Sequence, residues 1–435
     1  MRMKKCMIHR SLLALAVSAA LGGAGMAHAT NGYFAHGYGT QTKAMGGAGM
    51  ARSHDSFAPG TNPAGIAGMS SRIDGALAWF RPDRSYTVSG NPSGPPAFGL
   101  TPGTVDSRSK NFFIPSLGFV HQIDDRRSWG IAVLANGGLN TDFPDIENAP
   151  GAPSGTFFGG TGAGVNLEQL LLIPTYAQTF MEGRLSIGVS PILGYQRFKA
   201  EGLAAFSEFS VDPENLSDNS TDTDTAYGGQ LGFQAQVNDR VRVGANYRSK
   251  LRGTTFDDFS GLFAEGGDFD IPETWGLGVA FEVTAQLTVA VDYQRINYSD
   301  VDSVGNPFSN LFRPDGSGRL GAENGAGFGW EDINVFKIGF QYAAPNGWTW
   351  RAGYNRGENP IPDEEVLFNI LAPGVMEDHF TFGFSTDVGE SGEIHFASMY
   401  APSKSVRGPN PLDPAQTIKL EMDQFELELG YSYRF

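Results

Sequence analysis

Cysteine is almost absent from this sequence of 435 residues, whose single cysteine is Cys6. Cys6 lies in a segment with the three parts of a secretory signal peptide: the basic stretch MRMKKCMIHR, the apolar stretch SLLALAVSAALGGAGM and the cleavage pattern Ala27-His28-Ala29. We therefore expect residues 1–29 to be removed and the exported chain to begin at Thr30 without cysteine. That excludes disulfides, thiol chemistry and thiolate metal sites.

Positive charge is also scarce: 31 Lys and Arg residues face 47 Asp and Glu residues, which gives a net charge of −16. Loss of the four basic residues of the signal segment makes it −20. Such a charge repels phosphates and argues against nucleic acid as a partner. Apolar runs of about 18 residues are missing after Thr30, and the mean hydropathy is −0.22. We therefore expect no transmembrane helix, which leaves a closed β-barrel as the way to span a membrane.

The sequence does contain strict alternation of apolar and polar residues, seen most clearly in its last segment, FELELGYSYRF. One set is apolar or aromatic: Phe425, Leu427, Leu429, Tyr431, Tyr433 and Phe435. A period of two is typical of a β-strand between an apolar and a polar medium, and aromatic residues at one end are typical of a membrane interface. We predict that Leu429 faces lipid. We predict that Glu428 faces a wet lumen, where Glu428→Gln should have little effect.

The same alternation recurs along the chain and predicts an all-β fold, a 14-stranded antiparallel transmembrane β-barrel over residues 71–435. The strands are expected to begin near residues 71, 108, 127, 166, 184, 225, 240, 272, 286, 331, 347, 377, 392 and 417. Six short turns alternate with seven long connections, the last of them at 401–416. An even number of strands joined in this way is typical of outer-membrane barrels.

Residues 30–70 precede the first strand. They are rich in Gly and Ala, show no period, and are too apolar for a disordered tail. We predict that this segment is an N-terminal hatch that plugs the barrel from inside.

Several stretches resemble the FadL/TodX family of outer-membrane channels for hydrophobic compounds. The main one is Asn62-Pro63-Ala64-Gly65, which follows the Gly- and Ala-rich stretch directly before the first strand. The others follow in order along nearly the whole mature chain: FIPSLGFVHQI (113–123), WGIAVLANGGL (129–139), GGTGAGVNLEQL (159–170), IPETWGLGVAF (271–281) and WTWRAGYNRGENPIP (348–362). The ordered series is more specific than any one of its motifs.

The resemblance implies that ligand is captured at outward loops and released sideways, through a gap made by an inward kink of the third strand. It places hatch or gate residues at Asn31, Phe34, Asn62, Pro63 and Ala64. It places the kink at Asn136, Gly137 and Gly138. A glycine pair provides a backbone that can bend there, although the residues alone fit a strand end equally well.

In family members that bind a fatty-acid carboxylate, basic residues line the barrel, and Arg197 and Lys199 in YQRFKAE match one such region. Both share the phase of residues that the alternation turns toward lipid, so an inward position requires a local bulge. At a second basic position, GFGWEDINVF, this sequence has Glu331 and no lysine. That departure weakens the case for a carboxylate ligand and leaves a neutral alkane or aromatic hydrocarbon open.

The long connections are unusually apolar for exposed segments. Their apolar residues include Leu203, Phe206 and Phe209 in one loop, Phe256, Phe259, Leu262 and Phe263 in another, and VLFNIL at 366–371. Such side chains can pack together to hold loops shut, but an apolar patch that faces outward marks binding. We therefore predict ligand capture there. The acidic residues of 212–224 lack the glycine and spacing of a calcium loop and are interpreted as a solvated face.

Two alternatives are an outer-membrane lipid hydrolase and a general diffusion porin. A hydrolase would use His395 and Ser398, which lie on opposite faces of a strand because they are three residues apart. A porin needs an open lumen, which a hatch would block. We therefore predict a monomeric channel, not an enzyme, in the outer membrane of a Gram-negative bacterium. It has no cofactor or metal, and its partners are a hydrophobic ligand, membrane lipid and, through Phe435, the barrel-assembly machinery.

Overall fold

The computed structural model describes residues 30–91, 100–145 and 162–435, so the predicted signal peptide lies outside the described residues. The strands are β1 (Arg72–Ser89), β2 (Gly103–Asp106), β3 (Phe112–Gln122), β4 (Arg127–Pro144), β5 (Gly162–Phe180), β6 (Leu185–Glu201), β7 (Asp222–Asn238), β8 (Val241–Arg248), β9 (Thr274–Glu282), β10 (Leu287–Ile296), β11 (Ile333–Ala343), β12 (Trp348–Gly357), β13 (Asp378–Val388), β14 (Gly392–Asn410) and β15 (Asp413–Arg434). The α-helices are α2 (Thr40–Lys43), α3 (Ala264–Gly267) and α4 (Asp302–Gly305). Short 3-10 helices in the hatch and loops include η1 (Ala58–Gly60), η2 (Pro63–Ile66) and η4 (Ala204–Phe209). Within the described ranges, no helix has the length and apolar character needed to cross a membrane.

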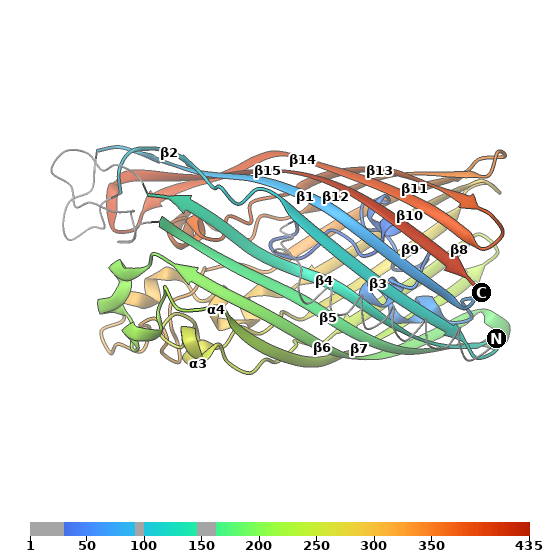
Figure 1. Cartoon of the computed structure of the whole chain (residues 1–435), viewed down its shortest axis with the longest axis horizontal. Coiled ribbons are helices and arrows are strands. Elements are labelled where there is room, and N and C mark those ends of the chain that lie inside the picture. Colours follow the sequence, from blue (N-terminus) through green and yellow to red (C-terminus); the bar gives the residue numbers. More distant parts are fainter. Residues whose placement is uncertain (1–29, 92–99, 146–161) are drawn as a thin grey trace.

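The strands form one antiparallel sheet in chain order, which closes because β15 pairs with β1 (Figure 1). Within the part of the chain that the structure describes, β2 pairs with β1 alone, near the end of that strand, and the other fourteen strands make the wall. The predicted fold class is therefore confirmed. Long loops gather at one end of the barrel, called here the loop end, and short turns gather at the other, the turn end.

One predicted connection is wrong, because residues 401–416 do not form a long loop. β14 continues to Asn410 and β15 begins at Asp413, so the two strands join through a tight hairpin. The stretch contains Pro402, which cannot donate to a ladder. A register shift between Ala401 and Lys404 accommodates this proline, and pairing continues beyond it.

The two faces of β15 follow the predicted alternation. Leu429 is 63% exposed on the outer face, whereas Glu428 is 2% exposed on the inner face. Tyr433 and Phe435 end the strand at the turn end, with ring centroids 6.4 Å apart. The expected wet lumen is absent at Glu428, because the hatch covers this side chain.

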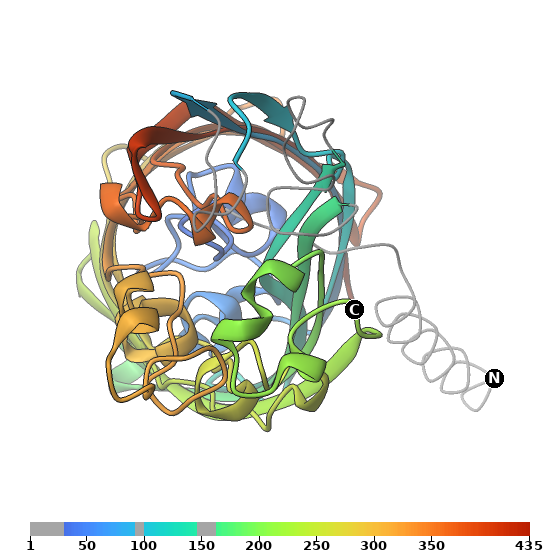
Figure 2. The same cartoon turned by 90° about the vertical axis from the view of Figure 1, so that its left-hand side faces the viewer.

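The segment before β1 lies inside the barrel, as Figure 2 shows in a view from the loop end. Asn62 begins η2: its Oδ1 accepts from the N–H of Ala64 (3.1 Å) and its Nδ2 donates to the carbonyl of Phe233 on β7 (3.0 Å). The wall accepts this close approach because a Cβ on Gly232 would lie 2.1 Å from Asn62 Oδ1, so glycine is needed there. Asn62, Pro63 and Ala64 thus hold the hatch against the wall.

Candidate functional site

An apolar cavity lies among the loops at the loop end. The space between its side chains, part of which is open to solvent, is about 500 Å³. It is lined by Val165, Phe198, Leu203, Phe206, Leu262, Phe263, Ser303, Leu320, Ala326, Gly327, Phe328, Phe368 and Leu371. Ser303 is the one polar side chain in this set, and its hydroxyl donates to the carbonyl of Asp268 (2.5 Å). The cavity therefore offers contacts suited to an apolar molecule.

The lining is held in place by packed aromatic rings. Phe198, at the upper end of β6, lies 4.6 Å from Phe263 and 4.8 Å from Phe259 between ring centroids. Phe263 also packs on Phe269 at 4.8 Å. These ring pairs fix the loop after β8 against the barrel wall.

Only part of the predicted capture set lines the cavity. Leu203, Phe206, Leu262 and Phe263 do, and residues 366–371 contribute Phe368 and Leu371. Phe256 and Phe259 are fully buried behind the lining, and Phe209 packs instead on Phe312 at 6.3 Å. Sequence reasoning missed Leu320 and Phe328, because single apolar residues in a long glycine-rich connection carry no periodic signal.

Arg197 and Lys199 point away from this cavity. β6 pairs with β5 and β7 without a register shift at these residues, so the bulge that an inward position requires is absent. Arg197 pairs with Glu168 at 3.4 Å and Lys199 pairs with Glu201, and both basic side chains are more than a third exposed. The alternation of side chains along β6 is enough to predict the outward direction of Arg197 and Lys199 that the structure shows. Glu331 does not line the cavity.

The barrel wall has a window between β3 and β4. Pairing between these strands ends at Leu117 and Val133, although β3 stays paired with β1 up to Phe112 and β4 stays paired with β5. Contact returns nearer the loop end, where the N–H of Arg108 donates to the carbonyl of Asp142 (2.8 Å). The window therefore lies between residues 110–116 and 134–141.

The hatch pairs with β4 at this window. A β-bulge lies between Ala135 and Gly137, and Phe34 forms a bridge with Gly137. The N–H of Ala35 donates to the carbonyl of Asn136 (3.0 Å), and the N–H of Gly138 donates to the carbonyl of Tyr33 (3.2 Å). A Cβ on Gly137 would lie 1.9 Å from that Tyr33 carbonyl oxygen, so only glycine permits this approach. The predicted kink residues thus coincide with a bulge that the hatch supports from inside.

The start of the hatch is held by Tyr298 in the connection between β10 and β11. Its hydroxyl donates to the carbonyl of Asn31 (2.6 Å) and accepts from the N–H of Tyr33 (3.2 Å). The predicted gate residues Asn31 and Phe34 are therefore buried between this loop and β4.

Two polar clusters fix the rest of the hatch to the wall. In the first, the Lys43 ammonium lies 2.8 Å from Glu426 and 2.6 Å from Glu428, and Thr40 donates to Glu428 (2.6 Å). Burial alone would lower the pKa of Lys43, but the two carboxylates outweigh it and raise that pKa. The ammonium therefore stays charged in neutral solution.

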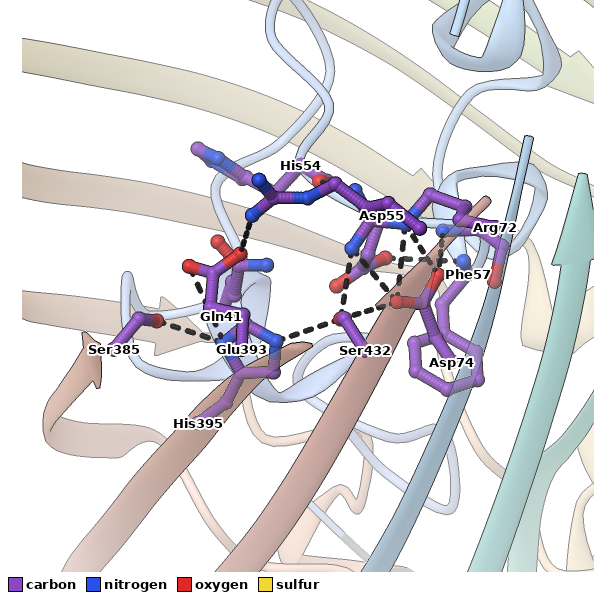
Figure 3. Close-up of polar contacts among 12 residues, drawn as sticks. Gln41, His54, Asp55, Phe57, Arg72, Asp74, Ser385, Glu393, His395 and Ser432 are labelled. Atoms are coloured by element: carbon purple, nitrogen blue, oxygen red, sulfur yellow. Dashed lines mark hydrogen bonds and ion pairs between the residues drawn. The ribbon is translucent and has the colours of Figure 1, made fainter. Parts of the chain in front are cut away.

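The second cluster lies near the turn end and joins the hatch to β1, β14 and β15 (Figure 3). Arg72 donates to Asp74 (2.7 Å) and to the carbonyl of His54 (3.2 Å), and His395 bridges Ser385 (2.8 Å) and Ser432 (2.7 Å). Asp55 lies beside this network. Its burial and the Asp74 carboxylate raise the pKa of Asp55 to about 7.

His395 does not act with Ser398. His395 is buried on the inner face, whereas the Ser398 hydroxyl is on the outer face and donates to the carbonyl of Phe382 (3.2 Å). In the acidic segment 212–224, Asp212 accepts from Asn215 and Ser260, both within 2.9 Å. This acid therefore has a structural role within the loops.

A family model described as "Outer membrane protein transport protein (OMPP1/FadL/TodX)" matches residues 18–407. The chain belongs to this family. Its members are transport proteins of the outer membrane, which places this barrel in the outer membrane of a Gram-negative bacterium, with the loop end outside and the turn end in the periplasm.

Relatives and solved structures agree with this assignment. The chain is 25% identical to a long-chain fatty acid transport protein of Salmonella typhi, over 70% of this chain and 74% of that protein. The structure of the P. putida toluene transporter TodX superposes with a TM-score of 0.66 at 19% identity, covering 92% of this chain and 99% of TodX. A Pseudomonas aeruginosa FadL homologue gives a TM-score of 0.65 at 15% identity, covering 93% of this chain and all of that one. At these identities the two structures show a shared fold.

Proposed function

We propose that this protein takes up neutral hydrophobic molecules, captures them in the loop cavity and releases them sideways through the window between β3 and β4. Relatives named for fatty acids and for toluene support a hydrophobic cargo. The observation that carries the choice of a neutral cargo is the lining of the cavity, where Ser303 is the one polar side chain. We propose that the protein acts as a channel and not as an enzyme.

A carboxylate would be poorly placed in this cavity. Transfer of an ionised group out of water without a partner is strongly unfavourable. The nearest predicted cations, Arg197 and Lys199, face outward and already pair with Glu168 and Glu201. A neutral alkane or aromatic molecule meets no such cost, and each CH₂ group that it buries contributes about 0.8 kcal/mol.

The path from cavity to window is short in the fold. Val165 lines the cavity and pairs with Thr141 on β4, and the Thr141 hydroxyl donates to the carbonyl of Leu371, another lining residue (2.8 Å). Thr141 borders the window. On the outside, Leu77 and Phe113 are each more than half exposed and face the lipid. Sideways release keeps an apolar ligand out of periplasmic water.

Uptake by cells that lack their own hydrophobic-compound channels tests the cargo. Cells that express this protein should take up toluene and hexadecane faster than palmitate, relative to cells with an empty vector. Palmitate uptake that exceeds both hydrocarbons would refute the choice of a neutral cargo.

Two variants test the exit. Deletion of Gly137 removes the extra residue of the bulge, and Gly138→Val adds a branched side chain to β4 beside the window without a change of register. Each should still fold, by heat-modifiable migration, and bind toluene at the loops, while toluene uptake falls at least tenfold. Normal uptake by either folded variant would refute the window as the exit.

Long-chain fatty acids are a second candidate cargo, favoured by a polar cavity between hatch and wall. Arg248 and Lys337 line it and are 2% and 7% exposed. A carboxylate that passes the loop cavity would meet two cations there, beside the Asp292 carboxyl that also lines this cavity. Faster uptake of palmitate, lost in Lys337→Met, would support this candidate.

The remaining partners are also part of the proposal. Phe435 is 57% exposed at the turn end, where the barrel-assembly machinery would reach it. We also propose that the barrel works as a monomer. The hatch fills the lumen, which supports a channel of this kind over a general diffusion porin, so single-channel recordings should show little steady current.

A further inference from the structure

A row of buried polar side chains crosses the inner wall from β4 to β7. Asn136 donates to Gln169 (2.9 Å), Gln169 donates to Gln196 (2.6 Å) and Gln196 donates to Asp224 (2.8 Å). Gln169, Gln196 and Asp224 are direct cross-strand partners on β5, β6 and β7, and all four residues are at most 1% exposed. Each amide in this row donates one N–H to the next residue in the direction of the Asp224 carboxylate. We call these four residues the amide row.

One end of the amide row holds the capture loop. The Asp224 carboxylate accepts from the N–H of Thr254 (2.7 Å) and from its hydroxyl (2.6 Å). Gln196 Nε2 also donates to the carbonyl of Phe269 (2.8 Å). The row is thus bonded to both ends of segment 254–269, which supplies Leu262 and Phe263 to the cavity.

The other end lies in the bulge at the window. Asn136 Oδ1 accepts from the hydroxyl of Tyr38 in the hatch (2.9 Å) and from the guanidinium of Arg248 (3.4 Å). Asn136 directly precedes Gly137, where the hatch bridges β4. A cation at one end and a carboxylate at the other polarise the amides between them in one direction.

Such a row resists independent movement of its two ends. Each amide is buried, so a shift that breaks one bond leaves a donor or acceptor without water to replace the partner. The neighbours of the row on the inner wall, Leu167, Leu171 and Phe198, are apolar and buried, so these wall positions offer no substitute partner; on the hatch side, the Tyr33 hydroxyl lies beside Gln169. A displacement of segment 254–269 is therefore transmitted to Asn136.

We propose that Gln169, Gln196 and Asp224 are positioning residues that couple occupation of the loop cavity to the shape of β4 at the window. This inference rests on the lateral release proposed above. A ligand that enters beside Phe263 moves the loop, the amide row follows, and the bulge at Asn136 adjusts to let the ligand out.

Gln196→Met tests the coupling, because methionine matches the length of glutamine and removes its three side-chain hydrogen bonds, to Gln169, Asp224 and the carbonyl of Phe269. Spin labels on cysteines at Phe113, in the window, and at Val133, the last β4 residue paired with β3, report how far the unpaired part of β3 lies from β4, and toluene is the probe. In the labelled protein that keeps Gln196, called the parent here, toluene should change this distance. In Gln196→Met the shift should be lost and toluene uptake should fall at least tenfold, while toluene affinity stays within twofold.

Gln234→Met is the matched control. Gln234 also faces the lumen from β7, but it donates to the carbonyl of Met50 in the hatch (3.0 Å) and is outside the amide row. This control should keep the toluene-dependent shift and the uptake of the parent. Equal effects of the two substitutions would reduce the role of Gln196 to general packing and overturn the inference.

Other outcomes separate this inference from the proposed function. If Gly138→Val blocks uptake but Gln196→Met keeps both the shift and the uptake, the window is the exit and the amide row does not control it. If Gln196→Met lowers affinity and uptake in proportion, the row only shapes the cavity. If Gly138→Val transports normally, lateral release itself fails, and the coupling fails with it.

Discussion

Removal of the Lys43 ammonium should loosen the hatch. Lys43→Met leaves the carboxylates of Glu426 and Glu428, each with a side chain 2% exposed, without their cation. Breaking a buried ion pair in this way costs about 3–5 kcal/mol. At about 1.4 kcal/mol for each factor of ten, hatch opening should become at least a hundredfold more frequent.

Hydrogen exchange of hatch amides measures this opening. The N–H of Lys43 donates to the carbonyl of Gly39 (2.9 Å), and the N–H of Ala44 donates to the carbonyl of Thr40 (3.0 Å). Both amides are therefore protected from hydrogen exchange while the hatch is docked. In Lys43→Met their protection should fall by two or more factors of ten. Amides of β15 serve as an internal reference and should not change.

Two further variants make the test decisive. Lys199→Met removes an exposed partner of Glu201, and such pairs contribute less than about 1 kcal/mol, so hatch protection should be unchanged. Adding Glu426→Gln and Glu428→Gln to Lys43→Met removes the unpaired charges and should restore most of the protection. A fall of less than threefold in Lys43→Met would refute the conclusion that this cluster anchors the hatch.

Three other outcomes are expected. Leu429→Arg puts a charge on the lipid face, which near the bilayer centre lowers the stability of the folded barrel by about 2–4 kcal/mol. The band of folded protein on heat-modifiability gels should therefore become weaker. An unchanged band would contradict the outward direction of Leu429. Phe263→Ser should weaken toluene binding about tenfold by calorimetry, whereas Phe259→Ser should mainly loosen the loop; the opposite ranking would reverse their roles. Because the pKa of Asp55 rises from 3.8 to about 7 on folding, stability should fall as pH rises from 3.8 to about 7 and level off above that pH, and Asp55→Asn should flatten this dependence in melts from pH 5 to 8.

The barrel and its hatch could be predicted from sequence because their signals are local. The alternation that ends with Tyr431, Tyr433 and Phe435 needs only the contrast between lipid and lumen at each residue. The glycine pair at 137 and 138 permits a bend, but from the residues alone it fits a strand end equally well. Gly137 is required because the Tyr33 carbonyl of the hatch leaves no room for a Cβ, a long-range contact that the local sequence does not indicate. Local alternation gave the outward direction of Arg197 and Lys199 correctly, while the family match suggested an inward one.

The hatch anchors could not be predicted, because they join residues far apart in the chain. Lys43 lies in a segment without a period, and nothing near it indicates a partner more than 380 residues away. Glu426 and Glu428 follow the polar phase of β15, which is the same whether water or a buried lysine lies opposite. The prediction that Glu428→Gln has little effect is therefore not supported by the structure, because the Glu428 carboxylate binds both Lys43 and Thr40.

The way the hatch supports β4 also bears on how barrels coexist in a crowded membrane. A strand with unpaired N–H and C=O groups is a template for pairing with another chain. Here Phe34 and its neighbours occupy the free side of β4 from within, and the opposite strand, β3, carries Pro115, which has no N–H to offer. We therefore expect the docked hatch to reduce the tendency of this unpaired stretch of β4 to pair with a neighbouring chain.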